Sequence, residues 1–285
     1  MHRLGVRVRR ADAELVLAAL LELAPAGLQE TDLDAQTVEY ALYGSSEELP
    51  SDGALRRLVG GALIGLEHSD VADDWEVRWR EFHRPLVLGD RLSVRPPWEP
   101  APATALDLVI DPGQAFGTGA HATTSLCLEL LLDRRPPARR QGPTVIDLGC
   151  GSGVLAIAAA RLGHVPVLAL DNDPLAIAAT AENAAVNGVA ELIAVRRFDL
   201  LGETVPPAPL VLANLLAPLL LAWAQAMPGP EHGEIIASGL LEHEAEPVSR
   251  AFARRGYRER QRLARDGWAA LLLQAPPDRA DPTAG

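Results

Sequence analysis

Lysine is absent from this chain of 285 residues, and cysteine occurs only twice. Every basic residue other than the seven histidines is arginine. Beside so much alanine, leucine and proline, this bias is typical of a GC-rich genome. The two cysteines, Cys127 and Cys150, provide no disulfide framework, and neither has the spacing of a metal site. We therefore expect neither a structural disulfide nor a bound metal.

Long apolar runs and positive charge are also scarce. No uninterrupted apolar stretch reaches the roughly 18–20 residues of a membrane-spanning helix. The chain starts M-H-R-L-G-V-R-V-R-R, which contains no apolar signal core. The formal net charge is −12, and an acidic surface repels nucleic acid and anionic membranes but suits a basic protein partner. We expect a cytoplasmic protein that binds neither nucleic acid nor membrane directly.

Three glycines at alternate positions, Gly149, Gly151 and Gly153, stand between an apolar stretch and an alanine-rich one. Glycine is needed where the backbone turns sharply or approaches a ligand closely. A helix that begins after such a turn presents free N–H groups. The stretch predicts a strand, a turn and a helix that form the floor of a cofactor site. A tight turn without a ligand is the alternative.

The glycine spacing also separates two kinds of cofactor. In the dinucleotide pattern G-x-G-x-x-G the third glycine comes one residue later, at a position where this chain has Val154. A nicotinamide-binding (NAD) oxidoreductase is therefore an alternative that the spacing disfavours.

An acidic residue ends the next apolar stretch, V-P-V-L-A-L-D-N-D-P. Asp171 lies 22 residues after Gly149, close to the spacing at which a carboxylate accepts hydrogen bonds from ribose hydroxyls. Asp173 and Pro174 are preferred types at a helix N-cap and at the first helical position. We expect Asp171 to bind a ribose and Asp173 to cap a helix. A plain strand-end turn is the alternative role of Asp171.

The order of the expected elements divides the chain into two parts. Residues 1 to about 70 follow the order β-α-β-β-α, which predicts a small ferredoxin-like module. Later strands alternate with helices, which predicts a doubly wound parallel sheet, and two runs around Asp266-Gly267 predict an antiparallel hairpin. The parallel strands are expected at residues 144–147, 167–171, 192–195, 210–213 and 235–238.

Two further segments have residues suited to a ligand. In D-P-G-Q-A-F-G-T-G-A-H-A-T-T-S-L-C-L-E-L, residues 111–130, Thr123 or Thr124 stands where a helix is expected to begin. Either hydroxyl can cap that helix or bind the polar end of a ligand. Asn214 ends a later strand. Because ligands bind outside the carboxyl ends of the strands in open α/β sheets, we expect Asn214 at the same edge as the glycine turn.

Four motifs occur in order: G-T-G-A-H-A-T-T, D-L-G-C-G-S-G, D-N-D-P and A-N-L-L-A. Together they resemble the ribosomal protein L-11 methyltransferase family, over about residues 75 to 275. The glycine turn alone is shared by all class I methyltransferases. The family commonly has proline where this chain has Ala122, a departure that leaves the threonines in place. The resemblance implies a class I, Rossmann-like doubly wound sheet with an antiparallel terminal hairpin and a small N-terminal α/β domain.

The same resemblance implies S-adenosyl-L-methionine as cofactor. The implied substrate is ribosomal large-subunit protein eleven, methylated on lysine side chains and on its N-terminal amine. Asn214 is the implied catalytic residue. Asp199 follows the third strand, where class I enzymes often hold the adenine amino group, although F-D-L is also an ordinary turn. For His121 we expect packing and assign no chemistry. The cofactor contacts implied by the motifs are Thr124, Gly149, Gly151, Asp171, Asn214 and Asp199.

The implied organisation is a substrate-recognition domain at residues 1–68, a hinge at 69–86 and a methyltransferase domain at 87–285, in a monomer. One alternative is a methyltransferase that acts on a glutamine side chain of another translation protein or on nucleic acid. Such enzymes usually have N-P-P-Y where this chain has N-L-L-A from Asn214, and the acidic charge disfavours nucleic acid. A non-catalytic module that keeps the fold is opposed by the glycine turn, Asp171 and Asn214 together.

Overall fold

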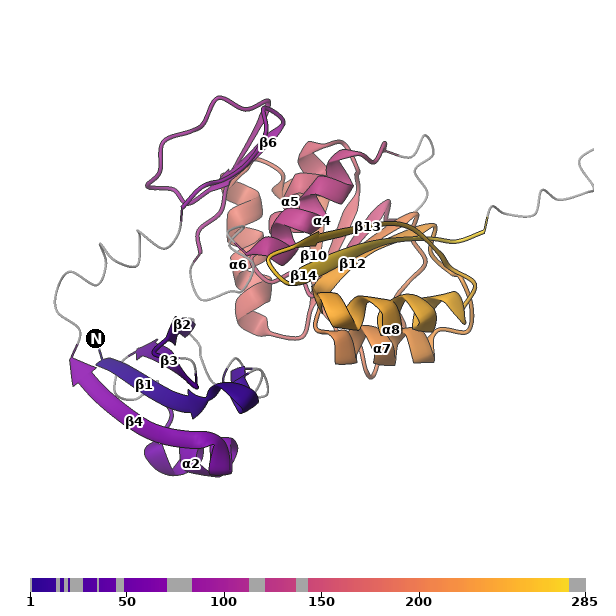
Figure 1. Cartoon of the computed structure of the whole chain (residues 1–285). Helices are drawn as coiled ribbons and strands as arrows, with labels where there is room; N and C mark the ends of the chain where they lie inside the picture. Colours follow the sequence, from indigo (N-terminus) through magenta and orange to yellow (C-terminus); the bar gives the residue numbers. More distant parts are fainter. Residues whose placement is uncertain are drawn as a thin grey trace, which may run out of the picture. The chain divides into compact units, whose positions relative to one another are not determined.

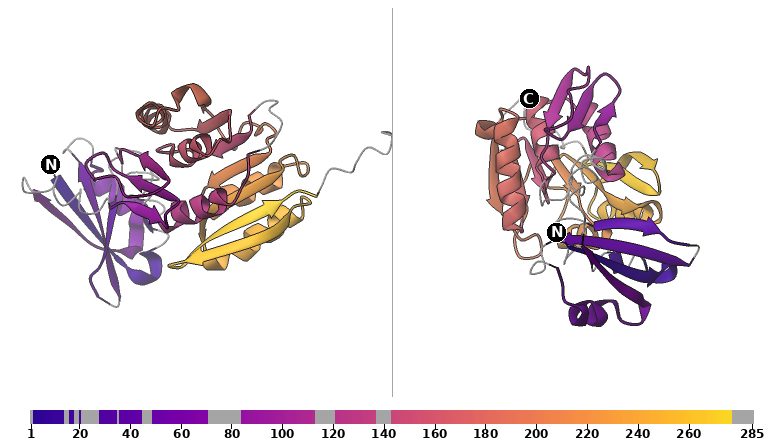
Figure 2. Two further views of the ribbon diagram at one scale, coloured as in Figure 1. Left: turned by 90° about the horizontal axis from the view of Figure 1, so that it is seen from above. Right: turned by 90° about the vertical axis from the view of Figure 1, so that its left-hand side faces the viewer.

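The computed structural model describes residues 2–13, 16, 17, 20, 28–34, 36–44, 49–70, 84–112, 121–136 and 143–276. The chain forms two compact units, one made mainly of residues up to 82 and one made mainly of residues from 83 onward (Figures 1 and 2). Most of the expected hinge, and the first residues of the G-T-G-A-H-A-T-T motif, lie outside the described residues.

The first unit contains a four-stranded antiparallel sheet with the order β2-β3-β1-β4. This is the order of a ferredoxin-like β-α-β-β-α-β unit. Helix α2 (Asp52–Val59) ends where Gly60 turns the chain with φ +56°. Leu63 then begins a fourth strand, which the expected order β-α-β-β-α does not include. The strands are β1 (His2–Arg9), β2 (Leu28–Asp32), β3 (Thr37–Gly44) and β4 (Leu63–Asp70).

The second unit is built on a seven-stranded sheet with the order β10-β9-β8-β11-β12-β14-β13. Its first five strands in that order are parallel, and β14 pairs antiparallel with both β12 and β13. The predicted doubly wound sheet and terminal hairpin are therefore confirmed. The strands are β8 (Val145–Leu148), β9 (Val167–Asp171), β10 (Ile193–Arg197), β11 (Leu210–Asn214), β12 (Glu234–Leu241), β13 (Arg258–Arg265) and β14 (Trp268–Gln274).

Helices cover both faces of this sheet (Figure 1). One face packs against α4 (Ala122–Leu132), α5 (Val154–Arg161) and α6 (Pro174–Val186), and the other against α7 (Ala217–Ala226) and α8 (Glu242–Ala253). A small three-stranded sheet of β5 (Leu86–Leu88), β6 (Leu92–Arg95) and β7 (Leu106–Val109) adds its apolar side chains to the α4–α5 side.

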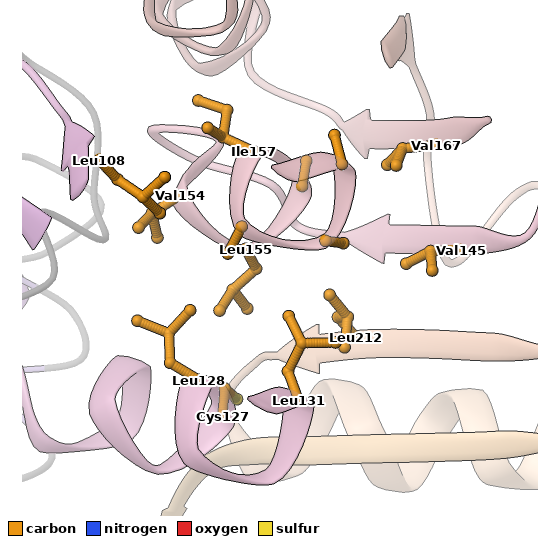
Figure 3. Close-up of a cluster of buried hydrophobic side chains, with 14 of the residues drawn as sticks. Leu108, Cys127, Leu128, Leu131, Val145, Val154, Leu155, Ile157, Val167 and Leu212 are labelled. Atoms are coloured by element: carbon orange, nitrogen blue, oxygen red, sulfur yellow. The ribbon is translucent and has the colours of Figure 1, made fainter. Parts of the chain in front are cut away.

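The core on the α4–α5 side shows which strand side chains point to that face of the sheet. Leu131 of α4 lies beside Leu212 of the sheet, and Leu128 of α4 points toward Leu155 of α5, in one cluster that also includes Val145 (Figure 3). Successive side chains of a strand point to opposite faces. Positions 147 of β8 and 214 of β11 therefore share the face of Val145 and Leu212.

Candidate functional site at the carboxyl edge of the sheet

The order in which the chain adds strands to the sheet reverses between β8 and β11. From β8 the chain passes through α5 to β9 on one side, whereas β11 and β12 extend the sheet on the other. Open α/β sheets bind ligands in the crevice outside such a point, beyond the carboxyl ends of the strands. The glycine turn follows β8 directly, and Asn214 ends β11. The two segments thus flank the switch point.

Each glycine of the turn is in the left-handed region, with φ of +75° at Gly149, +53° at Gly151 and +82° at Gly153. A Cβ atom on Gly149 would lie 2.4 Å from Cδ2 of Leu215. A Cβ atom on Gly153 would lie 2.9 Å from Cγ2 of Thr180. Backbone conformation therefore favours glycine at all three positions, and close packing against Thr180 adds to this at Gly153.

Asp171 ties the glycine turn to the end of β9. Its Oδ2 accepts the N–H of Gly151 at 2.9 Å, and its Oδ1 accepts the N–H of Asp173 at 3.0 Å. Each carboxylate oxygen has a second lone pair, and the residue is partly exposed. Asp171 thus holds the turn and can still accept hydrogen bonds from a ligand. Asp173 caps α6 by accepting the N–H of Leu175 at 2.9 Å, as predicted.

Asn214 and Thr124 are brought together although 90 residues separate them in the sequence. Asn214 Nδ2 donates to Thr124 Oγ1 at 3.4 Å. Thr124 is fully buried on the first turn of α4. The Oδ1 atom of Asn214 is buried and has no hydrogen-bond partner within the described part of the chain. A buried acceptor without a partner is costly, so this atom indicates a place for a donor that the described residues do not supply.

His121, rather than either threonine, caps α4. The helix begins at Ala122, so the two threonine hydroxyls lie inside its first turn, and Nδ1 of His121 accepts the N–H of Thr123 at 3.4 Å. The ring of His121 packs edge-on against Trp268 at 4.7 Å between centroids. Burial lowers the pKa of His121. Packing is thus the role that the structure gives this residue, with capping added.

Asp199 is exposed in a turn after β10. Its Oδ1 accepts the N–H of Leu201 at 3.0 Å, which is the ordinary turn role that the F-D-L sequence allows. The preceding residue, Phe198, donates its N–H to the backbone oxygen of Asp171 at 2.8 Å. Asp199 therefore follows a residue that is bonded to the end of β9.

Asp147 was not among the site residues expected from the sequence. It is 1% exposed on β8, two residues before Gly149, and its Oδ2 accepts the N–H of Ala156 at 2.9 Å. Its Oδ1 has no partner among the described residues. Burial, with a contribution from the charge of Asp171, raises the pKa of Asp147 to about 7. The sequence contained one signal for this position. Side chains alternate between the two faces along β8, so position 147 lies on the same face as Val145, toward α5.

Neither a metal-binding cluster nor a membrane-spanning helix occurs within the described ranges. No group of three or more His, Cys, Asp or Glu side chains there is arranged to hold a metal ion. No helix within those ranges has both the length and the apolar character needed to cross a bilayer.

The doubly wound sheet, its antiparallel terminal hairpin and the glycine turn after β8 define a class I methyltransferase fold. A family model described as Ribosomal protein L11 methyltransferase (PrmA) matches residues 5–276. The chain belongs to this family.

Individual relatives agree with that assignment. The Ribosomal protein L11 methyltransferase of Pelotomaculum thermopropionicum is 41% identical over 242 residues, which cover 79% of this chain and 77% of that protein. That of Methylococcus capsulatus is 40% identical over 253 residues, covering 85% and 82%. A crystal structure of ribosomal protein L11 methylase from Lactobacillus delbrueckii subsp. bulgaricus superposes with a TM-score of 0.59 at 29% identity, covering 68% of this chain and all of that one.

Proposed function

We propose that this chain transfers methyl groups from S-adenosyl-L-methionine to ribosomal protein L11, on lysine side chains and on the N-terminal α-amine. One observation carries the proposal: Thr124 and Asn214 meet beside the glycine turn at the switch point of the sheet, and Oδ1 of Asn214 has no partner among the described residues. The names of the relatives support the choice of L11 as substrate.

The residues present fit this cofactor. Asp171 keeps lone pairs for ribose hydroxyls, and the glycines allow close approach of the backbone. Asp147 Oδ1, a buried acceptor oxygen without a partner among the described residues, suits a cationic compound that bears N–H groups. When bound, the cofactor supplies an electrophilic methyl group on a sulfonium sulfur. We propose that it is held by Thr124, Gly149, Gly151, Asp171, Asn214 and Asp199.

The acceptor amine must be neutral to attack, which sets the task of Asn214. A lysine amine has a pKa of about 10.4 and an α-amine one of about 7.7–8.0, so neutralising them at pH 7 costs roughly 4.6 and roughly 1 kcal/mol. Asn214 can accept an N–H of the amine and orient its lone pair without adding negative charge. A carboxylate there would hold the ammonium form. We propose that the proton leaves to water and that Asn214 acts by alignment and desolvation.

We propose residues 1–68 as the substrate-recognition domain, 69–86 as a hinge and 87–285 as the methyltransferase domain of a cytoplasmic monomer. A hinged small domain would allow several amines of one substrate to reach a single methyl donor. The acidic net charge of −12 suits a basic ribosomal protein and opposes direct binding of nucleic acid or an anionic membrane.

The test is to incubate the purified chain with methyl-labelled S-adenosylmethionine and the separated components of the large ribosomal subunit. We expect the label on L11, and hydrolysis should yield methylated lysine and a methylated N-terminal residue. Label on ribosomal RNA, on a glutamine side chain, or on no component would contradict the proposal.

A further inference from the structure

Helix α6 and its C-cap residue, Asn187, carry a row of buried polar side chains. Thr180, Asn183 and Asn187 are 0%, 3% and 8% exposed, and their spacing places them on one face of the helix. Asparagine is mostly exposed in proteins, and a helix that packed only for stability would present apolar side chains here. Each of the three side chains instead bonds to backbone groups of another segment.

The two asparagines complete the edge of strand β7. Asn187 accepts the N–H of Val109 at 2.9 Å and donates to the carbonyl of the same residue. Asn183 accepts the N–H of Asp111 at 3.0 Å. Four residues of helix rise about 6.0 Å and two residues of strand about 6.6 Å. The amides therefore match the strand and take the place of a further strand at the edge of the β5-β6-β7 sheet.

Asn183 differs from Asn187 in one contact. Its Nδ2 donates to the carbonyl of Ser152 in the glycine turn at 2.9 Å. Nδ2 of Asn187 donates instead to the backbone oxygen of Asn183 at 2.8 Å. Thr180 supports the same turn by donating to the carbonyl of Gly151 at 3.0 Å. One side chain, Asn183, thus joins the glycine turn to Asp111, where the 111–130 segment begins.

We propose that Asn183 is a positioning residue for the cofactor site. It fixes the carbonyl of Ser152, and with it the orientation of the turn, relative to Asp111. The inference rests on the proposed function, because it requires that the glycine turn binds S-adenosylmethionine. Asn187 has the same chemistry and similar burial but does not touch the turn, so the chain provides its own control.

The test compares Asn183→Asp with Asn187→Asp in the full chain. Each aspartate keeps an acceptor for the strand N–H and loses a donor to a carbonyl. We expect Asn183→Asp to raise the dissociation constant of S-adenosylhomocysteine at least about tenfold, and Asn187→Asp by less than about threefold. Thermal unfolding of the cofactor-free variants should show similar losses of stability. At lower pH the buried carboxyl of Asn183→Asp is protonated and regains a donor. The ratio of its dissociation constant to that of the wild type should therefore decrease.

Equal weakening of binding by the two variants, or wild-type affinity in Asn183→Asp, would overturn the positioning role. If Asn183→Asp does not fold, Asn183→Ser provides the same comparison, because its hydroxyl is too short to reach both Ser152 and Asp111. Failure of the wild-type chain to bind S-adenosylhomocysteine would overturn the proposed function itself, and this inference with it.

Discussion

Single atoms at the carboxyl edge of the sheet decide what the site can do. Asn214 directs its Nδ2 to Thr124, and its Oδ1 is buried without a partner in the part of the chain that the structure describes. Asp171 uses one lone pair of each oxygen to hold backbone N–H groups. The amide oxygen of Asn214 is an uncharged acceptor, so it favours the neutral form of a substrate amine. The carboxylate of Asp171 at the end of β9 suits the cofactor. The role of Asn214 in the reaction can be separated from cofactor binding by measuring turnover and affinity independently.

Asn214→Ala should lower turnover about 100-fold while the cofactor dissociation constant changes less than about threefold, because misalignment of the reacting groups costs rate rather than binding. Asn214→Asp keeps the size but adds charge and should also lower turnover at neutral pH, by holding the amine as ammonium. Steady-state methylation of L11, with calorimetric titration of the cofactor, checks both variants. Equal losses of turnover and affinity in Asn214→Ala would reduce Asn214 to a cofactor ligand.

At the scale of the elements, strand and helix positions followed from local pattern. The alternation of apolar runs with alanine-rich stretches predicted β8, β9 and β11 to within a residue or two, because each is a buried parallel strand. The cap of α4 was assigned to Thr123 or Thr124 and is His121, since the start of a helix shifts by a residue without changing its pattern. Contacts between distant segments, such as Asn183 with Ser152, leave no periodic signal.

A bulge in β12 makes another contact between segments that are distant in the sequence. Between Ala237 and Leu240 the register with β14 shifts, and Gly239 has φ +82°. A Cβ atom on Gly239 would lie 2.5 Å from the backbone oxygen of Leu215. The N–H of Leu215 donates to the carbonyl of Ser238 at 3.0 Å. This bulge therefore lets the segment after Asn214 lie against β12.

Gly239→Ala should lower the free energy of unfolding by more than about 3 kcal/mol, since strain at positive φ adds to a clash with rigid backbone. Gly267→Ala is the matched control. Gly267 has φ +80° and nothing within 4 Å of an added Cβ atom, so only the strain of about 1–2 kcal/mol applies. Urea denaturation of both variants measures the difference. Similar losses would show that Leu215 moves aside freely.

At the scale of the whole molecule, buried histidine links stability to pH. His232 is 2% exposed beside Trp223, and burial lowers its pKa to about 4. In the unfolded chain this histidine binds a proton as the pH falls below about 6.5, whereas in the folded chain it stays neutral until about pH 4. The free energy of unfolding therefore decreases as the pH falls from about 6.5 to about 4. Asp147, with its raised pKa, acts in the opposite direction: its contribution is lost as pH rises toward 7.

His232→Phe should remove its part of this dependence. Between about pH 7.5 and about pH 5, the unfolding free energy of the variant relative to wild type should shift in its favour by roughly 2 kcal/mol. Contributions common to both proteins, including that of Asp147, cancel in the difference. Denaturant unfolding at several pH values measures it. Parallel curves for the two proteins would mean that His232 titrates normally in the folded chain.

The account as a whole depends on a cofactor site at the carboxyl edge of the sheet, and calorimetric titration of the purified chain with S-adenosylmethionine tests that site most directly. We expect saturable heat for one site, strong weakening in Asp171→Ala, and no heat with NAD. No heat with S-adenosylmethionine from folded protein, or saturable binding of NAD, would contradict the account.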